Sequence, residues 1–111
     1  MEADQNKSLE LFTNAIEYDD TNYCYYYGMS NTLINLERLD EAELSANKAL
    51  GLLEEHKDSQ GGKLALANTN NLLGVIYQRK GDMDKEKEYY RQALEFNPNN
   101  KEARGNLDKL Q

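Results

Sequence analysis

Residues 67–100, ANTNNLLGVIYQRKGDMDKEKEYYRQALEFNPNN, decide the fold of this chain. Apolar residues recur at helical spacing from Leu73 to Tyr77 and again from Tyr89 to Phe96, which is typical of two amphipathic helices. A short polar break separates the two stripes. The stretch therefore predicts two consecutive helices joined by a tight turn.

The turn carries residues that can end one helix and begin the next. Gly81 suits the left-handed conformation that closes a helix, and Asp82 or Asp84 can cap the helix that follows. Gly74 in the first helix and Ala93 in the second are both small. We therefore expect the two helices to approach closely and to pack along their lengths.

This stretch resembles a tetratricopeptide repeat, which is a helix–turn–helix unit of about 34 residues. The positions that match the pattern are Leu73, Gly74, Tyr77, Gly81, Tyr90, Ala93 and Pro98. Two positions depart from it, because Asn70 stands where an aromatic residue is usual and Glu86 stands where a small residue is usual.

The resemblance implies an all-α fold, in which antiparallel helix–turn–helix repeats stack as a right-handed α-solenoid. It also implies a concave face lined by the first helix of each repeat, and a scaffold that binds other proteins rather than an enzyme. The scaffold serves many different partners, so the resemblance names none of them.

The preceding segment, residues 23–56, fits the same register as a degenerate repeat. The residues at its pattern positions are Tyr26, Met29, Ser30, Leu33, Leu39, Ala42, Ala46 and Ala49. Glu37 stands at the turn, where the later repeat has Gly81. The register of this repeat follows from its neighbours.

The remaining segments complete a single domain, residues 1–111. Residues 4–22 match the second half of a repeat, residues 57–66 form an insertion loop and a helix extension, and residues 101–111 form a capping helix. Because no first helix precedes residues 4–22, we interpret the chain as part of a longer array; in the alternative, this helix finds another partner. The sequence predicts about six helices, near 4–19, 22–37, 40–56, 62–80, 83–96 and 100–110.

Composition excludes several classes of partner. The 111 residues carry a net charge of −7, which argues against binding to a nucleic acid backbone or to an anionic membrane surface. One cysteine allows no disulfide within the chain, and no apolar run reaches the length of a membrane span. With no signal peptide in the sequence given, we expect a soluble, acidic protein and favour the cytoplasm.

The sequence contains no convincing catalytic, metal-binding or phosphate-binding motif. His56 follows two glutamates at a helix end, where a cation is stabilised by the helix dipole, and Cys24 has no base or cation near it in sequence. Residues 82–86 lack the later ligands of a calcium loop, and residues 61–63 lack the strand and hydroxyl of a phosphate loop. We therefore predict no catalytic residue, no cofactor and no metal.

The register instead predicts a peptide-binding surface on the concave side of the first helices. The side chains expected there are Tyr27, Asn31, Asn35, Asn68, Asn71, Gln78 and Arg79. Amides both donate and accept hydrogen bonds, which suits the backbone of an extended peptide. The family's clamp for C-terminal carboxylates uses Lys or Arg with Asn, whereas the clamp positions here hold Tyr27 and Asn31, with no basic pair in the next repeat. We therefore do not expect specificity for chaperone tails.

The resulting prediction is a protein-interaction scaffold that binds a peptide or a partner helix in its concave groove. The alternative is a structural fragment that associates with itself as a homodimer or an end-to-end stack. In that case the open first helix would supply the contact through Leu9, Phe12 and Ile16, which we expect on a face left uncovered by the missing helix.

Overall fold

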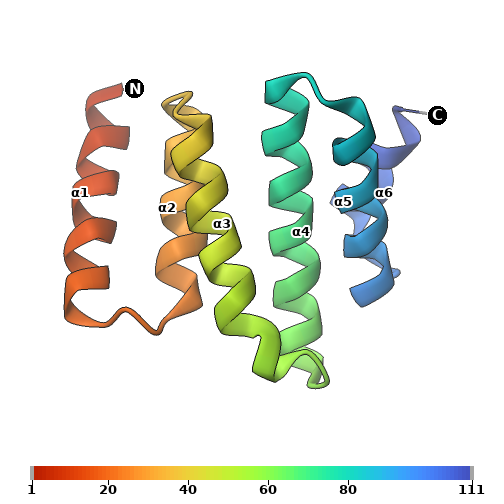
Figure 1. Ribbon diagram of the computed structural model, residues 1–111, viewed down its shortest axis with the longest axis horizontal. Helices are drawn as coiled ribbons and strands as arrows, with labels where there is room; N and C mark the ends of the chain where they lie inside the picture. Colours follow the sequence, from red (N-terminus) through yellow and green to blue (C-terminus); the bar gives the residue numbers. More distant parts are fainter. Residues whose placement is uncertain (1, 111) are drawn as a thin grey trace. The chain divides into compact units, whose positions relative to one another are not determined.

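A computed structural model of the chain describes residues 2–110, which contain helices and turns but no strand. The elements are α1 (Glu2–Tyr18), α2 (Tyr23–Asn35), α3 (Leu39–Leu53), a short 3-10 helix η1 (Glu54–His56), α4 (Gln60–Lys80), α5 (Met83–Phe96) and α6 (Lys101–Asp108) (Figure 1). The six predicted α-helices are all confirmed, and their ends agree with the sequence prediction to within one turn.

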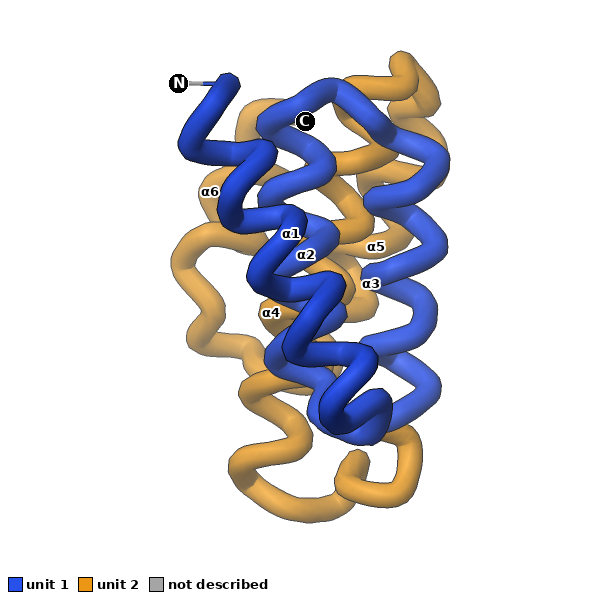
Figure 2. The backbone as a smooth tube through the Cα atoms, turned by 90° about the vertical axis from the view of Figure 1, so that its left-hand side faces the viewer, with its two compact units in different colours: residues 1–52 blue, residues 53–111 orange. Residues whose placement is uncertain are grey.

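The chain divides into two compact units, residues 1–52 (unit 1) and residues 53–111 (unit 2) (Figure 2). Unit 1 contains α1, α2 and nearly all of α3, and unit 2 contains α4, α5 and α6 after η1. Within each unit, consecutive helices run antiparallel and pack beside one another (Figure 1).

In unit 1, small residues of α2 lie at its contacts with α1 and with α3. The Phe12 ring of α1 lies directly on Gly28 of α2, where a side-chain methyl group would overlap it. On the other side of α2, the Ser30 hydroxyl donates a hydrogen bond of 2.7 Å to the Ala42 carbonyl of α3, and both residues are fully buried. Small residues at these points let the helices approach closely.

In unit 2 the closest approach joins α4 to α5. A methyl group at Gly74 would overlap the Tyr90 ring, and Tyr90 is 1% exposed. The expected close packing of the two helices along their lengths is confirmed. Ala93 lies further along α5 and packs with Ala67 and Ala103. Ala93 thus contributes to the contact with α6.

Glu86 does not prevent this packing, although it stands where the repeat pattern has a small residue. Its side chain is buried at 5% exposure, and its carboxylate accepts a hydrogen bond of 3.1 Å from the Tyr90 hydroxyl. Burial, followed by the negative charge of Glu86, raises the pKa of Tyr90, so this hydroxyl keeps its proton and remains a donor to the carboxylate.

The turn between α4 and α5 is formed by the residues that the sequence predicts. Gly81 has φ 82° and closes α4, and the Asp82 carboxylate accepts from the Lys85 amide to cap α5. Glu37 also has a positive φ, 59°, at the matching turn between α2 and α3. The chain thus uses the same left-handed turn twice, once with glycine and once without.

The predicted insertion loop is shorter than expected, because α4 already begins at Gln60. The Ser59 hydroxyl accepts from the Gly62 amide at 3.0 Å and donates to the His56 carbonyl at 2.9 Å. The His56 carbonyl lies so close to Gly62 that only glycine fits there. Gly62 therefore allows close packing against the His56 carbonyl.

Gly74→Ala tests the α4–α5 contact. The added methyl group must displace the Tyr90 ring, so we expect the free energy of unfolding to fall by about 1–3 kcal/mol. Gly51→Ala is the matched control, since nothing lies within 4 Å of a methyl group at that helical position and alanine there should stabilise by about 0.5–1 kcal/mol. Chemical denaturation measures both, and equal stability of the two variants would contradict the packing.

Glu37→Gly tests the cost of the left-handed turn. Glycine adopts a positive φ without steric penalty, so the substitution should raise the free energy of unfolding by about 0.5–1 kcal/mol. Gly81→Ala places a side chain in the same conformation and should lower stability by a similar amount. Thermal melts that move in the same direction for both variants would refute the assignment.

Candidate functional site

Polar side chains of α4 and α6 form a cluster in unit 2, here called the amide cluster. Its members are Asn68, Asn71, Asn100, Glu102 and Asn106. The Asn68 side-chain oxygen accepts from Asn100 at 3.0 Å, and the Asn71 oxygen accepts from Asn106 at 3.1 Å. The Asn71 nitrogen donates to the Glu102 carboxylate at 3.3 Å.

These bonds change the role of Asn71. The residue is only 6% exposed, and its oxygen and nitrogen both have partners on α6. It therefore holds α6 against α4 and offers little to an incoming ligand. Asn68 remains exposed beside it. The sequence placed both residues on the helix face but gave no measure of how far α6 would cover that face.

Two predicted residues at the far end of α4, Gln78 and Arg79, are exposed. They belong to the last turn of the helix, just before the Gly81 cap. Their side chains extend the polar face of α4 beyond the amide cluster.

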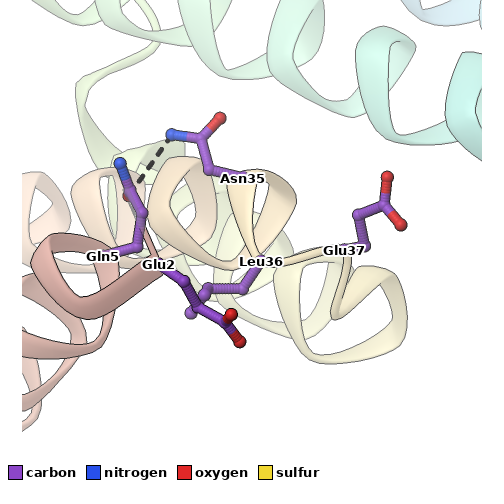
Figure 3. A pocket seen from close by; sticks show the side chains of 5 residues that line it. All are labelled: Glu2, Gln5, Asn35, Leu36 and Glu37. Atoms are coloured by element: carbon purple, nitrogen blue, oxygen red, sulfur yellow. Dashed lines mark hydrogen bonds between the residues drawn. The ribbon is translucent and has the colours of Figure 1, made fainter.

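In unit 1 the predicted polar face belongs to α2. Asn31 and Asn35 are exposed and Tyr27 is half-buried. The Asn35 nitrogen donates to the Gln5 oxygen of α1 over a weak 3.4 Å (Figure 3). The sequence did not identify Gln5, since a partner on another helix is known only once the helices are packed.

A hollow of about 410 Å³ surrounds the contact between Asn35 and Gln5. Glu2, Leu36 and Glu37 complete its lining; in Figure 3, Glu2 and Leu36 lie to one side of the amide pair and Glu37 lies further away. The hollow is open and lined mainly by polar groups. Its two carboxylates would favour a cationic or neutral ligand over an anionic one.

Charge is divided unevenly between the units. Residues 1–52 contain ten Asp and Glu against three Lys and Arg, whereas residues 53–111 contain ten of each. The whole net charge of −7 therefore belongs to unit 1. The acidic and basic residues of unit 2 balance one another.

The residues expected to drive self-association are partly covered. Phe12, expected on an open face, instead lies on Gly28, and Leu9 and Ile16 are half-buried. The apolar groups that α1 does expose are Leu11 at 60% and Tyr18 at 91%. The reason is that α2 alone covers the face of α1 that carries Phe12.

Groups that could support catalysis or metal binding do not converge. The described residues contain no cluster of three His, Cys, Asp or Glu side chains that could hold a metal ion. Cys24 is an exposed free thiol, and His56 has Glu55 as its neighbour, with 3.5 Å between the His56 ring nitrogen and the carboxylate. Between residues 2 and 110, no helix is long and apolar enough to cross a membrane.

Comparison with known proteins identifies the class. The sequence profile of the tetratricopeptide repeat matches residues 25–56 and 67–100. The chain belongs to the tetratricopeptide repeat family, whose domains are protein-interaction modules without enzymatic activity.

One relative is the heat shock protein STI1 of Saccharomyces cerevisiae, 30% identical over 108 residues. That match covers 96% of this chain but only 17% of the relative, so the chain spans about a sixth of the curated protein it matches. It corresponds to one segment of STI1.

Solved structures agree on the fold. The first tetratricopeptide domain of Spaghetti (RPAP3), bound to the HSP90 peptide SRMEEVD, superposes with a TM-score of 0.80 at 19% identity, covering 97% of this chain and 78% of that one. The N-terminal domain of stress-induced protein-1 from C. elegans gives 0.73 at 17% identity, with coverages of 90% and 76%. These likenesses confirm the all-α tetratricopeptide fold.

Asn71→Ala tests the structural role of the amide cluster. The substitution removes two bonds to α6 and strands Asn106 and Glu102, so it should lower the stability of α6 by about 1–3 kcal/mol. Faster hydrogen exchange of α6 amides would report the loss. Gln78→Ala, on the same helix but exposed, should stay within about 0.5 kcal/mol of the parent; unchanged exchange in α6 of the Asn71 variant would refute the role.

Proposed function

We propose that this chain is a protein-interaction module that binds an extended peptide or a partner helix through the polar faces of α2 and α4. The observation that carries the proposal is the set of exposed, hydrogen-bonding side chains on the first helix of each repeat. These are Asn31 and Asn35 on α2, and Asn68, Gln78 and Arg79 on α4.

The side chains on these faces define how a ligand would be held. Asn31 and Gln78 can each donate to a peptide carbonyl and accept from a peptide amide. Tyr27 would add contact area at little entropic cost. Asn71 would have a supporting role, because its hydrogen bonds join α4, the helix on which Asn68 lies, to α6.

The residues proposed on the α2 face include no Lys or Arg, which bears on the charge of the partner. The neighbour Spaghetti is described with the acidic peptide SRMEEVD, and the family's carboxylate clamp needs Lys or Arg. At the clamp positions of the first repeat this chain has Tyr27 and Asn31, in a unit that carries all of the net negative charge. We therefore propose a neutral or basic ligand for this chain rather than an acidic tail.

Self-association is the second candidate function. It is supported by the exposed side chains of Leu11 and Tyr18 on α1. The net charge of −7 in unit 1 opposes the pairing of two α1 helices, because like charges would meet. Light scattering decides between the candidates: a mass near 12.8 kDa at high concentration excludes a stable homodimer.

Peptide selection tests the proposed function. A displayed library of unstructured peptides would supply the probe, and the side-chain amide resonances of Asn31 and Gln78 would report binding. We expect Asn31→Ala to weaken the selected peptide by about 1 kcal/mol, while Glu88→Ala on α5 should have little effect. We expect SRMEEVD to bind far more weakly than the selected peptide.

The proposal fails under either of two results. One is a selected peptide that leaves the resonances of α2 and α4 unmoved. The other is a loss of affinity that is equal for Asn31→Ala and Glu88→Ala.

A further inference from the structure

The two repeats fill the same internal position differently. When residues 23–56 are aligned with residues 67–100, Leu33 corresponds to Tyr77 and Ser45 corresponds to Tyr89. In unit 2 the two tyrosine rings stack, with centroids 5.5 Å apart and planes within 6° of parallel. The Lys85 ammonium lies 5.1 Å from the centroid of the Tyr77 ring.

In unit 1 the corresponding position is a cleft of about 380 Å³. Leu9 of α1, Met29 and Leu33 of α2, and Leu44 and Ser45 of α3 line it. Leu33 and Ser45 are buried at its floor, and Leu44 stands 71% exposed at its edge. A leucine and a serine thus stand in this cleft at the positions that two aromatic rings occupy in unit 2.

The rim of the cleft is polar and adds no net positive charge. The Arg38 guanidinium and the Glu41 carboxylate form a two-point ion pair there, with one contact of 2.8 Å between Nη2 and Oε1. Including this pair, unit 1 carries ten acidic residues against three basic ones. A basic segment would therefore approach this unit more readily than an acidic one.

We infer that this cleft is a docking site for an aromatic side chain presented by a partner protein on a segment rich in Lys and Arg. The aromatic ring would take the place that Tyr77 and Tyr89 fill in unit 2, against the apolar walls of Leu9 and Leu33. The basic flanks would meet the acidic surface of unit 1. This site is distinct from the polar faces of α2 and α4, and it does not depend on them.

A second copy of the chain is the less suitable occupant. The aromatic residue that α1 exposes most is Tyr18, at 91%, but Glu17, Asp19 and Asp20 surround it in sequence. Inserting it into another unit 1 would bring two strongly acidic surfaces together. Charge complementarity therefore selects a different, basic chain.

Three synthetic peptides test the occupant. The probe is an acetylated, amidated peptide with one central Phe flanked by Lys and Ala. The two matched peptides replace Phe by Ala, or every Lys by Glu. We expect each replacement to weaken binding about tenfold or more. Added salt should weaken the Lys peptide, because screening shortens the reach of the charges to about 10 Å at 0.1 M.

Two variants test the location. Leu33→Tyr with Ser45→Tyr rebuilds the stacked pair of unit 2, and it should abolish binding of the Phe–Lys probe while the helical circular dichroism signal is kept. Leu44→Ser changes only an exposed residue at the edge, so it folds as the parent does and should weaken the probe about threefold or more. Methyl resonances of Met29 and Leu44 should shift on titration.

A matched pair of charge reversals separates local from global electrostatics. Glu10→Lys in unit 1 and Glu88→Lys in unit 2 change the net charge equally, and both residues are exposed. Only Glu10→Lys should weaken the Phe–Lys probe. Equal effects would show that net charge alone attracts the peptide.

Several results would overturn the inference. They are equal affinity for the Phe and Ala peptides, unchanged binding by the folded double-tyrosine variant, and shifts confined to Asn31 and Gln78. The last result would favour the proposed groove function while excluding this cleft. A concentration-dependent dimer that loses its contact on Leu44→Ser would assign the cleft to a second copy instead.

Discussion

The structure depends on the close approach of the two helices within each repeat. In unit 2 that approach requires Gly74, because the Tyr90 ring occupies the space a side chain would need. In unit 1 it requires Ser30, whose hydroxyl satisfies the Ala42 carbonyl inside the contact. Burying a polar group is tolerated only when it is hydrogen-bonded, so each repeat meets the same constraint with different atoms.

The two repeats also differ in which helix carries the large aromatic residue. The aromatic residue belongs to the first helix in one repeat, where Tyr26 aligns with Asn70, and to the second helix in the other, where Tyr90 aligns with Ala46. The polar groups that accompany this difference are not all matched: Asn70 donates to the Leu66 carbonyl, but its side-chain oxygen is buried without a hydrogen-bond partner. A repeat scaffold tolerates such changes because each unit packs chiefly against its neighbours.

The two units also differ in their internal contacts and in their charge. The neutral unit 2 uses its amides and aromatic rings internally, with Asn71 joining α4 to α6 and Tyr77 stacked on Tyr89. Unit 1 carries the net charge and leaves the matching aromatic position open, where Leu33 and Ser45 stand. The net charge thus lies in unit 1, whereas unit 2 is neutral and presents the exposed polar end of α4.

The sequence by itself determined the helices, the Gly81 turn and the family, because apolar spacing and helix capping are local properties of the chain. Four of the residues that it predicted for a binding face, Asn31, Asn35, Gln78 and Arg79, are exposed. Only the tertiary structure decided that the Asn71 side chain hydrogen-bonds to α6 and that the Phe12 ring packs on Gly28 of α2. Each of these outcomes depends on which side chain of another helix lies opposite, and sequence spacing within one helix contains no information about that distance.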